Sequence, residues 1–184
     1  MVTEAAAVPT RVDGDIAEIM ALMPYGVYIV GSRDTLGESN GMMADWVMQV
    51  SFRPRMVAVS FENDAHTLAN IRENGWFSVN FLPANEEGRH LAARFLQPYD
   101  GNKVAGRSQG QKAVIHHKMD GVGYSTAPHG SPVLAGSFAW LECEARQFVP
   151  CGDHTLVIGE VIAGQLRGEA ETLSSEYTGW TYSG

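Results

Sequence analysis

Short apolar segments rich in β-branched and aromatic residues, each bounded by turn residues, recur along this chain and constrain its fold more than any other feature. Such side chains favour strands, because they pack well on a pleated surface. Strands are expected at residues 26–32, 42–50, 56–61, 76–82, 137–146 and 154–162. No strand–helix–strand rhythm repeats between them, so the pattern predicts a mainly β fold, an antiparallel barrel with peripheral short helices.

Helical spacing marks the segments outside these strands. A short helix is expected at residues 15–23, because Pro24 cannot continue it. Its apolar residues Ile16, Ile19, Met20 and Met23 recur at helical spacing and are expected to pack against the next part of the chain. A second helix is expected at 63–74. Its start is expected to be capped by Asp64 or Thr67, and Gly75 fits the left-handed position beyond its end.

Two further local patterns give testable expectations. Asn85 is expected to cap another helix, on which Leu91 and Phe95 lie one turn apart. In residues 137–146, alternation predicts one buried face, formed by Ala139, Leu141, Cys143 and Ala145 and opposed to Trp140, Glu142, Glu144 and Arg146.

Charge and length limit the class of protein. Lys plus Arg number 13 and Asp plus Glu 21, for a formal net charge of −8. This charge repels nucleic acids and anionic lipid, so neither is expected as a partner. The N-terminus lacks a signal pattern and no run approaches the ~20 apolar residues of a spanning helix, which predicts a cytoplasmic protein.

The 184 residues are expected to form a single domain. Residues 1–14 are interpreted as a loose N-terminal arm and residues 97–112 as a long loop. Residues 164–184 are interpreted as a C-terminal tail with the aromatic residues Tyr177, Trp180 and Tyr182. The favoured interpretation is that this tail docks on its own barrel; the alternatives are that it closes a dimer or stacks near a ligand.

A search for known catalytic and metal-binding motifs narrows the chemistry. The chain has no Walker loop, Cys-x-x-Cys, His-Glu-x-x-His or Gly-x-Ser-x-Gly. His116 and His117 are adjacent and point apart on an extended chain, so no metal site is expected. Cys143 is expected to fill the core, and Cys151, beside a turn, to be more open.

Residues 39–82 carry the pattern that indicates a ligand. After the Asn40-Gly41 turn, extended backbone can offer N–H and C=O groups to a flat heteroaromatic ring. A few residues after the next strand, His66-Thr67 begins a helix, whose unpaired N–H groups and hydroxyl can hold a phosphate.

These motifs, in this order, are shared with a known family. They are the Asn40-Gly41-Met42 turn, FSVNFLP ending at Pro83, GSPVLAGSFAWLEC and GDHTLVIGEV. Through them the chain, over roughly residues 21–163, resembles the flavin reductase-like family. The resemblance implies a six-stranded antiparallel Greek-key split barrel that binds FMN and forms a homodimer, with the flavin near the dimer interface.

The resemblance also implies the roles of individual residues. Met43 to Trp46 would line the isoalloxazine, and Asn80 would approach it from a neighbouring strand. His154 would border the nicotinamide pocket as the catalytic residue. The cofactor-binding set is Asn40, Met42, Met43, Ala44, Asp45, Trp46, Ser60, Asn63, His66, Thr67, Asn80 and Arg89, of which Ser60, Asn63, His66, Thr67 and Arg89 would surround the phosphate end.

The implied function is an oxidoreductase that accepts hydride from NADH or NADPH on flavin N5, with FMN favoured over FAD. Electrons would pass to free flavin, to a monooxygenase or other redox protein, or to another small acceptor. Many flavin-exchanging members of the family have a loop rich in serine and threonine where this chain has Met42, Met43, Asp45 and Trp46. In this respect the chain is similar to the flavoredoxin-type branch, which leaves open whether flavin is a resident cofactor or is exchanged. Two alternatives remain: a non-catalytic flavin-binding electron carrier, and a pyridoxamine-phosphate oxidase-like or haem-binding split barrel.

Overall fold

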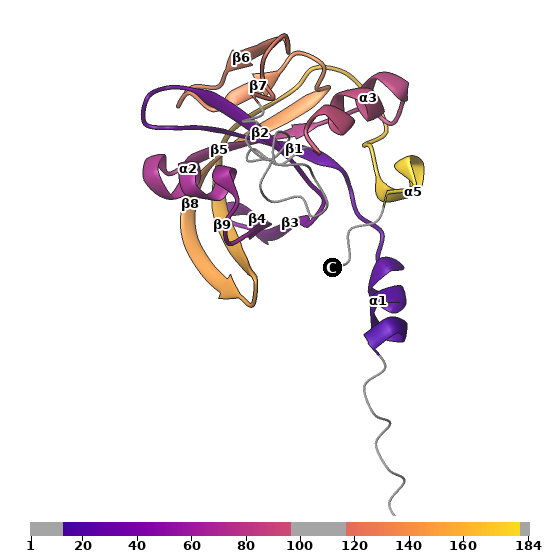
Figure 1. Ribbon diagram of the computed structural model, residues 1–184. Coiled ribbons are helices and arrows are strands. Elements are labelled where there is room, and N and C mark those ends of the chain that lie inside the picture. The colour runs from indigo at the N-terminus through magenta and orange to yellow at the C-terminus, as the bar shows by residue number, and fades with distance from the viewer. Residues whose placement is uncertain (1–12, 97–116, 181–184) are drawn as a thin grey trace, which may run out of the picture.

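The computed structural model describes residues 13–96 and 117–180 and contains a strongly curved antiparallel sheet with short helices around it (Figure 1). The helices are α1 (Asp13–Ala21), α2 (His66–Asn74), α3 (Glu86–Arg94) and α5 (Ser175–Thr178). The strands are β1 (Tyr28–Arg33), β2 (Ser39–Ala44), β3 (Val47–Phe52), β4 (Arg55–Glu62), β5 (Trp76–Phe81), β6 (Tyr124–Thr126), β7 (Pro132–Leu134), β8 (Ala139–Cys151) and β9 (His154–Leu166).

The main sheet has the order β2-β1-β5-β8-β9-β4-β3, and β6 and β7 form a separate pair. The mainly β, antiparallel prediction is confirmed, but the main sheet has seven strands rather than six. The expected strand at 42–50 is in fact two, because the chain turns a corner at Asp45 and Trp46 between β2 and β3. The sheet curls until β2 contacts β4, and α2 packs on β1, β2 and β4. No helix among the described residues is both long and apolar enough to cross a membrane.

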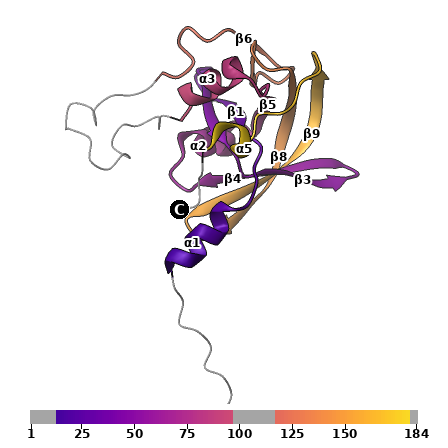
Figure 2. The same cartoon turned by 90° about the vertical axis from the view of Figure 1, so that its right-hand side faces the viewer.

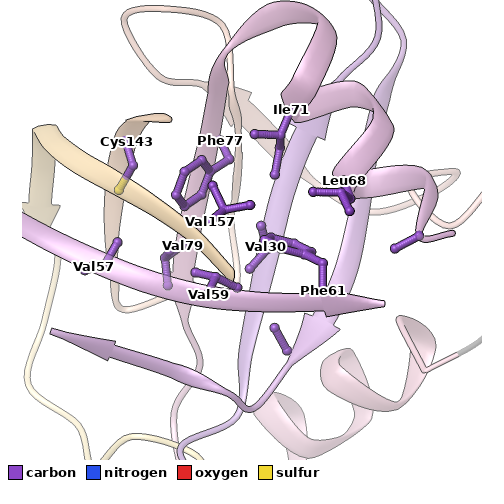
Figure 3. Packing of buried hydrophobic residues seen from close by; sticks show 12 residues of the cluster. Val30, Val57, Val59, Phe61, Leu68, Ile71, Phe77, Val79, Cys143 and Val157 are labelled. Carbon is purple, nitrogen blue, oxygen red and sulfur yellow. The ribbon is translucent and has the colours of Figure 1, made fainter. Parts of the chain in front are cut away.

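Buried apolar side chains form two clusters. The larger one lies inside the curved sheet and beneath α2, and includes Val30, Val59, Phe61, Leu68, Ile71, Phe77 and Val79 (Figure 3). The smaller one joins α3 to β1 and β7 through Ile29, Leu82, Phe95 and Leu134. Full burial of a side chain such as Phe61 or Phe77 contributes about 1.5–3 kcal/mol to folding.

The helix ends follow the sequence signals in part. Gly75 ends α2 with φ 81°, and the Asn85 side chain accepts the backbone N–H of Gly88 at 2.8 Å, as predicted. The predicted cap of α2 is wrong. Ala65 is the N-cap residue, and no side chain caps this helix.

The expected alternation in β8 is also wrong at one point. Glu142 and Cys143 are both fully buried, because the register with β9 shifts between them and both side chains face protein. The Glu142 carboxylate accepts the backbone N–H groups of His129 and Ser131, and His129 Nδ1 lies 3.1 Å away from it. A buried carboxylate needs such donors, since ionised groups are costly to desolvate.

This burial predicts different reactivities for the two cysteines. Burial raises the pKa of the Cys143 thiol to about 12, and the charge of Glu142 acts in the same direction. The thiolate is the reactive form, so a disulfide reagent at about pH 8 should label only exposed Cys151 in the folded protein. Two thiols should react in denaturant, and none in folded Cys151→Ser. Equal labelling of both thiols in the folded protein would contradict the burial of Cys143.

The two termini differ from expectation. Asp13 and Gly14 belong to α1 rather than to a loose arm, and 164–166 continue β9 rather than beginning a tail. Trp180 packs against the smaller cluster, which agrees with a docked tail. Residues 1–12, 97–112, His116 and Tyr182 lie outside the described residues.

The expectation that the first helix packs against the barrel is wrong. Figures 1 and 2 show α1 leading away from the sheet. Its apolar residues Ile16, Ile19 and Met20 are 40–62% exposed, and Met23, two residues beyond its end, is 48% exposed. The sequence spacing correctly marks an apolar face, but the chain's own barrel does not cover it.

Candidate functional site

Three chain segments meet beside the β2–β3 corner: the corner itself, the β4–α2 turn and the start of β9. The corner is fixed to β4, since Ser60 donates its backbone N–H to Trp46 O at 3.1 Å. The Trp46 ring lies 4.9 Å from the ring of His154, centre to centre, and 6.5 Å from that of Tyr25. Trp46 and His154 were both predicted as site residues and are far apart in the sequence; their rings are in contact in the structure.

His154 follows a tight turn and is held by its neighbour. Gly152 has φ 66°, a left-handed conformation that glycine adopts readily, and the chain reverses there from β8 into β9. His154 Nδ1 lies 2.7 Å from Asp153 Oδ1, and the His154 side chain is only 12% exposed. A carboxylate accepts but does not donate, so Nδ1 carries a proton, and Nε2 is an acceptor whenever the ring is uncharged. This bond and the charge of His154 lower the pKa of Asp153.

Asn63 fastens the turn that carries His154 to the start of α2. Its backbone N–H donates to Asp153 O at 3.0 Å, and its side-chain amide donates to Gly152 O at 3.1 Å. Its Oδ1 accepts the hydroxyl of Thr155 at 2.7 Å, and Arg72 of α2 donates to that hydroxyl oxygen at 3.2 Å. The described contacts of Asn63 thus position the histidine.

The end of α2 at this corner suits an anion. No side chain caps it, and the first N–H groups of a helix have no partner within the helix. Thr67 is 2% exposed, and its hydroxyl oxygen accepts the Asn40 side-chain amide at 2.8 Å. That bond ties α2 to β2 and leaves the hydroxyl proton available for donation. A helix N-terminus beside an aromatic surface is an arrangement that can hold a phosphate group next to a flat ring.

Asp45, at the same corner, is half-buried. Burial raises the pKa of its carboxyl above the usual value, opposed by hydrogen bonds from the backbone of Asp45 and Trp46 and by the charge of His154. Because its pKa is raised on folding, the Asp45 carboxyl binds more protons in the folded protein than in the unfolded chain. Its ionisation therefore lowers the free energy of unfolding as pH rises from the unfolded pKa of ~3.9 to the higher folded pKa.

Asp45→Asn should therefore raise the melting temperature at neutral pH by about 2 °C, a small gain because the group is partly solvated. The gain should vanish below about pH 4, where both states of the wild-type carboxyl are protonated. Calorimetry at the two pH values checks this. A gain of equal size at both would assign it to something other than ionisation.

Several predicted site residues lie elsewhere or are occupied by packing. Met42 packs against the larger cluster and Met43 against the smaller one, and Ala44 is buried in the larger. The Met43 N–H already donates to Phe95 O at 3.4 Å. Arg89, on α3, pairs with Glu86 of the same helix at 3.3 Å.

Asn80 is fully buried and its amide is occupied by protein groups. Nδ2 donates to Ile29 O, Ser78 Oγ and Pro132 O at 3.1–3.3 Å, and Oδ1 accepts the Leu134 N–H at 2.8 Å. These bonds fasten β7 to β1 and β5, so the described contacts give Asn80 a structural role.

Some residues at the corner were missed by the sequence analysis. Asp153 stands in the turn that the sequence analysis placed beside Cys151, and its adjacency to His154 is a signal that could have found it. Tyr25 and Thr155 reach the site only through folding, and no local pattern marks them. Among residues 13–96 and 117–180, no three His, Cys, Asp or Glu side chains are grouped as metal ligands would be.

Comparisons with known proteins agree with this fold. The family model described as the flavin reductase like domain matches residues 20–181. A relative named flavin reductase (NADH), from Kitasatospora aureofaciens, is 32% identical over 88% of this chain and 76% of its own length. Diflavin flavoprotein A 1 of Synechocystis is 30% identical over 89% of this chain, which spans only 26% of that relative's length.

A solved structure, the NADH:FAD oxidoreductase SgcE6 of Streptomyces globisporus, has the same fold. It is 25% identical, with a TM-score of 0.71 and 93% and 92% of the two chains covered. The family match extends over nearly all of the sequence. This protein belongs to the flavin reductase like domain family.

Proposed function

We propose that this chain binds FMN at the β2–β3 corner and is an NAD(P)H-dependent flavin oxidoreductase. One observation carries the proposal: the Trp46–His154 pair and the uncapped end of α2 lie at the same corner. Bound FMN would supply a ring that takes up hydride at N5. The family membership and the relative named flavin reductase (NADH) support this reaction.

The residues of this chain have separate tasks in the proposed site. The N–H groups at the start of α2, with the Thr67 hydroxyl, would hold the phosphate; Ser60 and His66 lie on the two segments that lead to it. Trp46 and Asp45 would border the ring. His154 Nε2 would accept an N–H of the nicotinamide carboxamide, because Asp153 keeps the proton on Nδ1.

We further propose a homodimer, and transfer of electrons to free flavin, a monooxygenase or another redox protein. The resemblance supports both. FMN is proposed over FAD because one helix end matches one phosphate group, whereas a relative in the comparisons is named for FAD.

The visible spectrum of the purified protein tests the function. FMN and FAD are added in turn, and NADH or NADPH is then added without oxygen while flavin absorbance is followed. Rapid bleaching with tighter binding of FMN supports the proposal. Binding without bleaching by either nucleotide favours the electron carrier, and a haem spectrum favours the haem-binding alternative. A colourless chain that binds neither flavin overturns every flavin function.

A further inference from the structure

The exposed face of α1 is amphipathic and lacks a partner in its own barrel. Ile16, Ile19 and Met20 occupy helical positions i, i+3 and i+4, the spacing of a helix that packs on another surface, and Met23 follows two residues after the helix ends. Their exposed fractions are 41%, 62%, 40% and 48%. A contiguous apolar face of this kind is a mark of an interaction site.

β3 also exposes apolar side chains, which lie on both faces of the β3–β4 hairpin because a bulge between Gln49 and Ser51 interrupts the alternation. Met48, Val50 and Phe52 are 63%, 42% and 83% exposed. Among the described strands, β3 pairs only with β4, so it forms one edge of the main sheet. Edge strands are usually shortened, charged or covered, because they associate readily with other chains. The exposed apolar side chains of β3 therefore also indicate a surface that another chain covers.

The charges on the two surfaces are opposite. On α1, Asp15 and Glu18 are exposed, whereas Arg53 and Arg55 are exposed at the turn from β3 to β4. None of the four forms an ion pair with a described residue. Opposite patches beside apolar ones favour association in one register.

A single copy with this fold cannot bring these surfaces together. In Figure 2, α1 descends on one side of the sheet and the β3–β4 hairpin projects on the other. A second copy related by a two-fold axis can, since each α1 then meets the other copy's hairpin and the contact is made twice.

We propose that two copies of this chain exchange their α1 helices, each laid on the β3–β4 hairpin of the other. The proposal rests on the proposed homodimer and names its contact surfaces. Exposed apolar side chains of α1 and of the hairpin are buried in each contact, and acidic α1 side chains meet the basic hairpin turn.

The exchanged helices would adjoin both candidate sites. Tyr25 follows α1 closely and its ring lies 6.5 Å from that of Trp46, while β3 begins directly after Trp46. Both surfaces of the proposed interface therefore continue directly into the β2–β3 corner. Because the proposed flavin site lies at that corner, flavin affinity should fall when the dimer dissociates.

Reciprocal charge reversal tests the exchange. The variant Asp15→Arg/Glu18→Arg and the variant Arg53→Glu/Arg55→Glu should each raise the dimer dissociation constant at least about 10-fold in sedimentation, because each places like charges in both contacts. Mixing the two variants should restore a heterodimer of near wild-type affinity, since both contacts are again between opposite charges. Glu169→Arg, at an exposed acid outside both surfaces, should leave association unchanged.

The outcomes separate the contact from the dimer and from the function. Weakening by both variants with recovery on mixing supports the exchange. A dimer that neither variant weakens overturns the exchange and leaves the homodimer standing. A wild-type monomer at all concentrations overturns both. FMN titration of the wild-type dimer is a separate measurement, so failure of that dimer to bind flavin counts against the proposed function alone, whereas weaker FMN binding by the dissociated variants is expected from the exchange.

Discussion

Asn80→Leu should destabilise the protein by about 3–5 kcal/mol and leave the flavin affinity of the remaining folded protein unchanged. Leucine has a similar volume but cannot replace the amide. The buried Leu134 N–H would lose its partner at a cost of about 1–3 kcal/mol, and Ile29 O, Ser78 Oγ and Pro132 O would each lose a donor, although the Ser78 hydroxyl still donates to Pro132 O. The urea midpoint measures the loss, and FMN titration at low temperature measures affinity.

Gln147→Leu is the matched control, because it changes an exposed amide on β8 in the same way. We expect it to alter stability by less than about 0.5 kcal/mol. If Asn80→Leu unfolds at the wild-type urea concentration but loses flavin, Asn80 contacts the cofactor, as the family resemblance implies, and its structural role is wrong.

Asn80 shows why some residues could not be assigned from the sequence. Its acceptor Pro132 and its donor Leu134 are more than 50 positions away in the chain, on a strand of three residues. The same holds for Asn40 and Thr67, which bond to each other across 27 positions. A buried amide and a ligand-binding amide look alike in sequence, because both are polar residues on apolar strands.

Two helix ends set by neighbouring residues were predicted correctly, whereas the predicted side-chain cap of α2 was not. Gly75 and Asn85 end and begin helices for local reasons of backbone conformation and capping. The β8 bulge was missed because the period of two assumes an unbroken ladder, and the shift at Glu142 depends on the register with β9. The spacing on α1 marked an apolar face correctly but carries no information on what covers it.

The candidate site was predicted in part. The sequence placed Asp45, Trp46, Asn63 and His154 in one site, and the structure brings their segments together at one corner. The structural role of Asn63 could not be predicted from the sequence, because its hydrogen bonds to Gly152 and Thr155 join residues about 90 positions apart. Its described bonds hold His154 in place.

His154→Ala should lower kcat/KM for the nicotinamide substrate by roughly 10- to 100-fold while FMN still binds. The proposed task of His154 is to orient the nicotinamide, and the start of α2, which would hold the phosphate, is left intact. Stopped-flow bleaching of the FMN-loaded protein measures the loss. His90→Ala, at an exposed histidine on α3, is the control and should be neutral. A fully active His154→Ala protein would remove His154 from the site.

The neighbouring carboxylate separates orientation from charge. Asp153→Asn retains an oxygen that can accept Nδ1–H, so Nε2 stays an acceptor and KM should change by less than about threefold. Asp153→Ala removes that acceptor and frees the ring to rotate or change tautomer, so KM should rise about 10-fold with little change in kcat. Equal losses in the two variants would mean that the charge of Asp153 matters, because only the alanine variant loses the hydrogen bond.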